Sequence, residues 1–299
     1  MKKPEYSLWI LALFFLVLGW SCKTPAPPTL EETPENPWAS ISLDRIGARD
    51  LNQVNLEFTL EADNPRSSPA EVRIGNYKAV INGKETNDGI RFYTDQEKTA
   101  FPVSPAAGGP GSTEIPLLLE LDIARLTAMG LSLEHDYQVT LTVDVEFVYP
   151  SGAPVHVSAR GLAVFPRIQE PVFTITAIAV LKAELINTRF RVTMKVDNPN
   201  PFPMELSAFN YDLYGDGRLW ADGTEKNVLR IPAADSAATQ LFLIMNFTNM
   251  KRPMLDRIVA LEDVNYRFAG DVQVTTGMDY LPRFRSDFDL SGYSKVYEN

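Results

Sequence analysis

The residues best suited to metal or acid–base chemistry are few in this chain. His135 and His156 are the two histidines, and no cysteine or third histidine stands near them to complete a set of metal ligands. Acidic residues are plentiful, but their spacing singles out no pair for acid–base work. The glycine-rich Gly108–Thr113 lacks the lysine and following helix of a phosphate-binding loop. The sequence therefore predicts no catalytic residue, metal or cofactor, and we expect both histidines at the surface or at strand ends.

A second candidate for metal binding is the acidic stretch that begins at Asp212. In a calcium-binding loop starting there, the third position would be Tyr214 and the closing glutamate would be Gly223, and neither supplies a carboxylate. The pair Asp216-Gly217 is instead typical of a two-residue hairpin turn. We therefore expect a turn at this place rather than a metal site.

Cys22, the single cysteine, follows a short hydrophobic leader. Lys2 and Lys3 precede the apolar stretch Leu8–Leu18, which has about half the length that a bilayer-spanning helix needs. A charged start and a short apolar middle are typical of a secretory signal. We expect residues 1–21 to be a signal peptide and the mature protein to lie outside the cytoplasm. With one thiol, the chain has no internal disulfide to stabilise its fold.

The end of this leader, Gly19-Trp20-Ser21-Cys22, resembles the bacterial lipobox, in which the cysteine thiol is diacylated and becomes the new N-terminus. The resemblance implies a lipid on Cys22 that anchors the protein to a membrane of the bacterial cell envelope, at the outer membrane or the periplasmic face. Leu18 lies four residues before the cysteine, where the lipobox places its aliphatic residue three before it. Gly19 and Ser21 also fit ordinary signal peptidase, which would leave Cys22 as a free thiol.

Residues 22–37 are rich in proline and glutamate, with five prolines between Lys23 and Pro37. Proline fixes the backbone φ angle and removes a hydrogen-bond donor, so an extended spacer is expected here rather than a packed element. At roughly 3.1 Å per residue, it could hold a folded domain up to about 45 Å from a membrane surface. We predict a tether, and the alternative is a disordered tail without a role.

The overall composition is that of a globular protein, with 45% hydrophobic and 22% charged residues. The formal net charge of −10 disfavours nucleic acid and anionic lipid headgroups as partners. No second apolar segment approaches the length of a membrane span, so we expect the mature protein to be soluble apart from any lipid.

Two parts of the chain repeat each other at a constant offset of 134 residues. The matched pairs are Asp63-Asn64-Pro65 with Asp197-Asn198-Pro199, Asn76-Tyr77 with Asn210-Tyr211, and Asn82-Gly83 with Asp216-Gly217. Ahead of the first pair, apolar and polar residues alternate in both repeats, which predicts strands with one buried face. The residues expected in the cores are Leu56, Phe58 and Leu60 in the first repeat, and Phe190, Val192 and Met194 in the second.

A later strand aligns at an offset of 129, which matches Tyr137 with Tyr266. We attribute the change of offset to about five extra residues in the first repeat, at the loop Ala106–Gly111. Before this strand each repeat has a short helical pattern, capped by Asp122 in the first repeat and by Asn249 in the second. Six to eight short strands and one small helix per repeat predict a β-sandwich.

The sequence thus predicts an all-β protein of two tandem immunoglobulin- or fibronectin-III-like β-sandwiches, each with one short helix. Their predicted bounds are 38–166 and 171–299. Proline stands at both ends of the connection Pro166–Pro171, so we expect the two sandwiches to hold a limited range of orientations.

The stretch from Val196 through Asn198-Pro199-Asn200-Pro201 to Tyr214 resembles the WHy (water stress and hypersensitive response) domain of type 2 late embryogenesis abundant proteins. That family is marked by a strand ending in Asn-Pro-Asn-Pro, then an apolar residue and a strand that contains tyrosine. The first repeat keeps Asp63-Asn64-Pro65 but has Arg66-Ser67-Ser68-Pro69 in place of the second Asn-Pro, so it resembles a degenerate copy. The resemblance implies a fibronectin-like sandwich without a known catalytic site, of a kind found on exported bacterial proteins.

Physical reasoning assigns the motif a structural role. A proline excludes the residue before it from the helical region, so Asn198 and Asn200 must be extended or turning. Their amides are expected to bond backbone groups where the strand ladder stops. We interpret Asp63, Asn64, Pro65, Asp197, Asn198, Pro199, Asn200 and Pro201 as a folding device, with direct ligand binding as the alternative.

The favoured function is that of a non-enzymatic, exported, lipid-anchored protein that gives desiccation- or stress-related protection or binds a partner in the envelope. Its expected partners are the membrane, through a lipid on Cys22, and an envelope protein or client protein. One alternative is a carrier that takes an apolar ligand between its sheets, which would need a cavity there. The other is an enzyme whose site is built from loop carboxylates.

Overall fold

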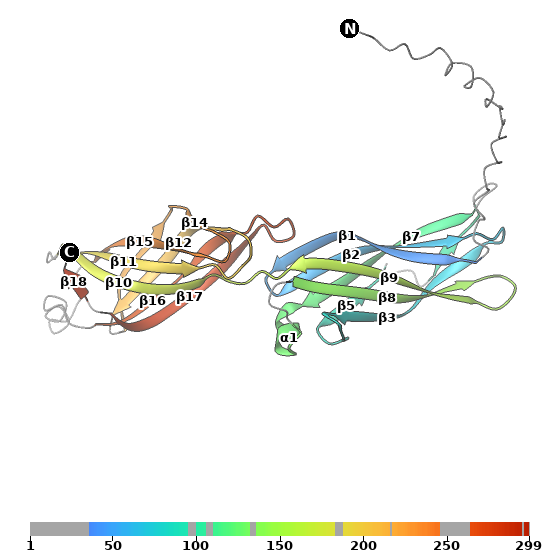
Figure 1. Ribbon diagram of the computed structural model, residues 1–299, viewed down its shortest axis with the longest axis horizontal. Helices are drawn as coiled ribbons and strands as arrows, with labels where there is room; N and C mark the ends of the chain where they lie inside the picture. The colour runs from blue at the N-terminus through green and yellow to red at the C-terminus, as the bar shows by residue number, and fades with distance from the viewer. Residues whose placement is uncertain are drawn as a thin grey trace, which may run out of the picture. The chain divides into compact units, whose positions relative to one another are not determined.

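The computed structural model describes residues 36–94, 100–105, 110–131, 136–182, 188–215, 217–245, 264–294 and 296–298. These residues form one short helix and β-sheets that are antiparallel except for the parallel pair β10–β18, which confirms the predicted all-β class. The strands β1 to β9 make up the first sandwich and β10 to β18 the second, and no strand pairs with a strand of the other sandwich (Figure 1). No helix in the described ranges is long and apolar enough to cross a membrane.

The first sandwich consists of two sheets. One sheet has the order β1 (Trp38–Asp50), β2 (Gln53–Asn64), β7 (Gly111–Asp122) and β5 (Ile90–Tyr93). The other has the order β4 (Lys84–Glu85), β3 (Ala70–Ile81), β8 (Asp136–Val148) and β9 (Val155–Pro166), and β6 (Phe101–Val103) also pairs with β3. Helix α1 (Ile123–Ala128) begins where predicted, because the Asp122 side chain accepts a hydrogen bond from the Arg125 backbone N–H.

The second sandwich repeats this plan except at the edges of its first sheet, where β18 is added beside β10 and no described strand corresponds to β5. Its first sheet has the order β15 (Ser236–Met245), β11 (Thr188–Asp197), β10 (Val172–Lys182) and β18 (Val296–Glu298). Its other sheet has the order β13 (Arg218–Glu225), β12 (Met204–Gly215), β16 (Val264–Thr275) and β17 (Arg283–Ser294), with β14 (Leu229–Ile231) paired to β12. The helix predicted to follow Asn249 lies outside the described residues.

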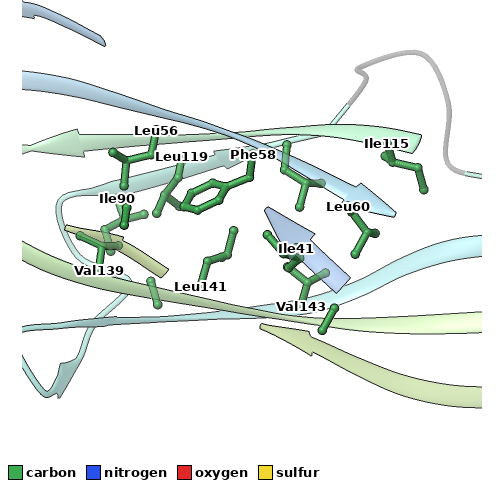
Figure 2. Packing of buried hydrophobic residues seen from close by; sticks show 14 of the residues in the cluster. Ile41, Leu56, Phe58, Leu60, Ile90, Ile115, Leu119, Val139, Leu141 and Val143 are labelled. Carbon is green, nitrogen blue, oxygen red and sulfur yellow. The ribbon is translucent and has the colours of Figure 1, made fainter. Parts of the chain in front are cut away.

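Each sandwich has its own hydrophobic core, built from the inward residues of both sheets. In the first, Leu56, Phe58 and Leu60 on β2 point toward Leu141 and Val143 on β8 (Figure 2). All six residues that the alternating pattern assigned to the two cores are at most 1% exposed, so the predicted strand faces are confirmed. In the second core the ring of Phe288 lies against those of Phe173 and Phe268.

The strand registers correct the sequence alignment of the late strands. Tyr77 pairs with Val143 and its counterpart Tyr211 pairs with Gly270, so the late strands match at an offset of 127, not 129. The alignment was wrong by two residues, and because strand side chains alternate with a period of two, such a shift leaves every inward residue inward. The hydrophobic pattern could not detect this error.

The length difference between the repeats is also spread more widely than one loop. Asp63 and Asp197 differ by 134 in number, whereas their ladder partners Ser112 and Ser236 differ by 124. Part of the extra length of the first repeat lies in the connection between β3 and β6, which contains β5. Ala70 on β3 and Met204 on β12 differ by 134 in number, whereas their ladder partners Val103 and Ile231 differ by 128. Gly111 belongs to β7, and residues 106–109 of the predicted loop lie outside the described ranges.

Candidate functional site

The Asn-Pro turn of the second sandwich is built around two buried amides. Asn198 is 2% exposed and its Nδ2 donates to the carbonyl oxygens of Phe202, at 2.7 Å, and Pro232, at 2.9 Å. Its Oδ1 accepts from the backbone and side-chain nitrogens of Asn200, both at 3.0 Å. Asn198 therefore joins the end of β11 to the backbone just before β12 and just after β14, and the hydrogen-bonding capacity of its amide is largely used within the fold.

Asn200 fixes the connection between the two sandwiches. It is fully buried, its Oδ1 accepts from the Gln169 backbone N–H at 2.8 Å, and its Nδ2 donates to the Gln169 carbonyl at 2.9 Å. A side-chain amide paired with both backbone groups of one residue acts as one more rung of a ladder. The backbone at Gln169, within Pro166–Pro171, is therefore held against the second sandwich.

The turn of the first sandwich uses one amide instead of two. Asn64 is fully buried, donates to the Ser68 carbonyl at 2.8 Å and accepts from the Arg66 backbone N–H at 3.1 Å and from the Tyr149 hydroxyl at 3.1 Å. Arg66 stands at the position of Asn200, and its guanidinium lies 4.3 Å from the centre of the Tyr149 ring. The burial of Tyr149 raises the pKa of its hydroxyl, and nearby Arg66 opposes this shift.

The aspartates that open the two motifs have different electrostatic surroundings. Asp63 carries one buried oxygen without a hydrogen-bond partner, and burial, followed by the charge of Glu61, raises the pKa of its carboxyl. In the second sandwich Lys195 replaces Glu61, and its ammonium lies 2.5 Å from Asp197. The two motifs therefore share a backbone path but differ in the charge that lies beside their first carboxylate, which is positive for Asp197 and negative for Asp63.

Tyr280, in the loop between β16 and β17, contacts both hydrophobic cores. Its hydroxyl donates to the Pro166 carbonyl, its own carbonyl accepts from the Ala48 N–H at 2.9 Å, and its ring meets Phe165 edge-on. Burial, then the neighbouring Tyr137 and Asp136, raise the pKa of the Tyr280 hydroxyl. In the adjoining connection, burial and Asp287 raise the pKa of Glu170.

The other sequence candidates are distributed through the fold. Asn82 and Gly83 form the predicted two-residue turn with positive φ angles of 51° and 81°, and Gly217 has a φ of 75° in the matching turn. His156 is exposed on β9, with its ring nitrogen 3.8 Å from Glu146. Phe284 and Phe288 are buried in the second core. Cys22, the leader, the tether, His135 and Asp216 lie outside the described residues.

Sequence reasoning missed the roles of Gln169 and Tyr280. Gln169 is recognised only through its backbone, which no side-chain pattern reveals. For Tyr280 a signal did exist, because Met278, Tyr280 and Leu281 make the loop after β16 unusually apolar for a hairpin connection.

The described residues show no cluster for metal binding. Nowhere in the described ranges do three or more His, Cys, Asp or Glu side chains come together as metal ligands. The larger hollows found there are open to solvent, and one of about 560 Å³ near α1 is lined mainly by polar groups such as Arg49, Asp88 and Arg125. The expectation of no metal site remains a prediction, and the carrier remains an alternative.

Comparison with known sequences gives one family match. The sequence model of the LEA_2 family, late embryogenesis abundant protein, matches residues 193–285. This range begins in β11 and ends in β17, so the second sandwich contains a LEA_2-like domain. No curated protein matches the chain.

Solved structures give only distant likenesses. A protein from Archaeoglobus fulgidus is 17% identical over 43% of this chain and 96% of its own, with a TM-score of 0.28. The CupB6 tip adhesin from Pseudomonas aeruginosa is 11% identical over 86% of this chain and 98% of its own, with a TM-score of 0.27. A Bacteroides uniformis beta-glucuronidase is 12% identical over 79% of this chain and 26% of its own, with a TM-score of 0.26. At these scores the likenesses carry no functional argument.

Proposed function

We propose that this protein is a non-enzymatic, exported, lipid-anchored protein with two LEA_2-type sandwiches that protects other proteins under water stress through its folded surface. The observation that carries the proposal is that the side-chain amides of the family motif form their hydrogen bonds within the fold. The amides of Asn198 and Asn200 are buried and bonded to backbone groups, which supports a folding device rather than a ligand site. Protection would then reside in the outer surfaces of ordered domains.

The proposal extends the LEA_2 family to the first sandwich as a degenerate copy. Support comes from Asn64, which turns the chain after β2 as Asn198 does after β11. It also comes from the strand order, which is the same in one sheet and, in the other, for β1, β2 and β7 with β10, β11 and β15. Arg66 and Tyr149 take the place of the second amide. The loss of Asn-Pro at this point is thus compensated within the turn, and it does not argue against common descent of the two halves.

The anchor is proposed on the sequence alone. Cys22 would carry lipid in the bacterial envelope, and residues 22–37 would space the sandwiches from the membrane. Mass spectrometry of the mature N-terminus from the native host tests this, with diacylated Cys22 as the expected species. Replacing Cys22 with Ser should release a folded protein into the soluble exported fraction, and an unmodified cysteine in the native protein would end the anchor proposal.

Protection is tested by drying or heating an aggregation-prone enzyme with the purified chain that lacks residues 1–21. We expect the chain to be ordered in dilute buffer beforehand, since its composition is too apolar for a disordered hydrophilic shield. It should limit aggregation better than an unrelated sandwich of equal net charge. Equal protection by that control would reject the stress role, and saturable capture of one envelope component would then identify the protein as a partner-binding module.

A further inference from the structure

The same outer face of the two sandwiches carries opposite charge. On β2 of the first sandwich, Glu57 and Glu61 project outward and are exposed. The equivalent outward positions on β11 of the second sandwich hold Arg191 and Lys195. Residues 38–166 contain 17 Asp and Glu against 10 Lys and Arg, whereas residues 171–299 contain 16 against 14. The charge at two equivalent positions of one face is therefore inverted; Lys195 is ion-paired with Asp197, and the exposed Arg45 on β1 stands opposite Glu57.

The acidic face of the first sandwich is hollowed. An open hollow of about 580 Å³ lies over β1, β2, β7 and the end of β5. Its rim carries the carboxylates of Asp44, Glu57 and Glu120, and Pro116 and Leu118 provide an apolar floor. The hollow thus combines an apolar surface with negative charge, which suits a partner that presents apolar side chains beside cations.

The basic face of the second sandwich presents that combination. Phe242 and Ile244 on β15 are 58% and 62% exposed, and in the ladder they stand opposite Arg191 and Arg189. Among the described residues no carboxylate lies within ion-pair distance of either guanidinium, and the Nε of Arg191 is buried without a hydrogen-bond partner. Such exposed aromatic and arginine side chains are the residue types most enriched at protein interfaces.

The strand at the margin of this face is also less protected in the second sandwich. In the first sandwich β5 covers the outer edge of β7, where Ile90 to Tyr93 pair with Leu121 to Leu118. In the described part of the second sandwich β15 is the terminal strand of its sheet, and the connection that contains β5 is longer in the first repeat than its counterpart in the second. An uncovered edge with outward apolar side chains is a surface that proteins usually protect or use.

We infer that the basic face of the second sandwich docks on the acidic face of the first sandwich of another copy of this chain. The occupant is a second copy because the chain itself carries both complementary faces, at equivalent positions of the same fold. Arginine pairs well with carboxylates at interfaces, and Phe242 and Ile244 fit the apolar floor beside Leu118. The contact is heterologous, so each copy leaves one face free and the assembly grows end to end unless it closes into a ring.

Two charge-exchange variants test this inference in the chain that lacks residues 1–21 and carries Cys22→Ser. One variant, E57R/E61K, gives the first sandwich the residues of the second, and the other, R191E/K195E, does the reverse. Each variant introduces charges of the sign that the equivalent positions of the other sandwich already carry. Near-ultraviolet circular dichroism and thermal unfolding check that both variants are folded.

Sedimentation velocity should show concentration-dependent association of the parent chain that weakens at least tenfold between about 50 mM and about 500 mM salt, because exposed charges are screened. Each variant alone should remain monomeric, and an equimolar mixture of the two should associate again. A parent chain that stays monomeric at about 0.5 mM in low salt overturns the inference. Binding of the parent, but not of R191E/K195E, to vesicles of anionic phospholipid without self-association overturns it in favour of a membrane surface.

Discussion

The two sandwiches stabilise the same turn with different side chains. In the second, Asn200 pairs with both backbone groups of Gln169 and so holds the interdomain connection, while in the first Arg66 occupies that position and lies over Tyr149. The surroundings of the aspartates that open the motifs differ likewise. Lys195 forms an ion pair with Asp197, whereas the negative charge of Glu61 raises the pKa of Asp63. The backbone path is therefore the shared requirement, and the chemistry that stabilises it differs between the halves.

The cores show the same freedom. Val143 faces Ala159 in the first sandwich, whereas at the equivalent pair Gly270 faces Phe288 in the second. The ring of Phe288 fills the space above Gly270 and lies against Phe173 and Phe268. The larger side chain of the pair is on β8 in the first sandwich and on β17, the neighbour of β16, in the second. A close-packed core tolerates such an exchange when the total side-chain volume is kept.

The largest expected effect comes from the first core. Phe58→Ala should lower the free energy of unfolding by about 3–5 kcal/mol, because a large aromatic that is 1% exposed leaves a cavity. Denaturant unfolding measures the loss. Val192→Ala, at the equivalent position of the second core, removes less volume and should cost less. A cost for Phe58→Ala below about 1 kcal/mol would contradict the packing of the first sandwich.

Gly270→Ala sharpens the comparison of the cores. A Cβ at residue 270 would stand 2.0 Å from the backbone oxygen of Asn210 and 2.8 Å from Phe288, so the ladder itself must shift. We expect a loss of about 1–3 kcal/mol in the free energy of unfolding. Gly47→Ala is the matched control, because its Cβ meets nothing within 4 Å and should change stability by less than about 0.5 kcal/mol. Equal values for the two substitutions would refute the tight approach at Gly270.

Asn200→Ala and Arg66→Ala compare the two turns directly. The first leaves the Gln169 backbone groups without their partner and should cost about 1–2 kcal/mol. The second removes a partly exposed cation–ring contact and should cost about 0.5–1 kcal/mol. Both losses are measured by denaturant unfolding of the chain without residues 1–21. The reverse order would show that the first turn depends on its arginine more than the second does on its amide.

How much of this could be read from the sequence is clearest in the strands. Period-two alternation identified the inward faces of β2 and β11 correctly, since burial of alternate residues is a local property. The same periodicity hid the two-residue error in matching Tyr137 with Tyr266, because both alignments bury the same face. The apolar loop around Tyr280 indicates burial but not its partner, a backbone group more than a hundred residues away. Gln169 is bound through its backbone by a residue about thirty positions away, so no local pattern encodes that contact.

The smallest expected effect concerns the charge balance at Asp63. Its raised pKa means that folding favours the protonated carboxyl, so its contribution to stability is greatest below the unfolded pKa and falls as the pH rises through the folded pKa. Glu61→Lys imitates the second sandwich and should lower the pKa of Asp63, weakening this dependence. Carboxyl chemical shifts followed by NMR during a pH titration measure the change. An unchanged Asp63 pKa in the variant would show that the charge of Glu61 does not contribute to the raised pKa of Asp63.

The central claim is that the Asn-Pro motif supports the fold while protection comes from the outer surfaces. The most direct test is the aggregation assay repeated with Asn200→Ala, at a temperature where unfolding experiments show the variant to be fully folded. We expect the same protection per molecule as from the parent chain, because Asn200 is buried and bonded to Gln169. A folded Asn200→Ala variant that no longer protects would contradict the claim and make the motif itself the functional site.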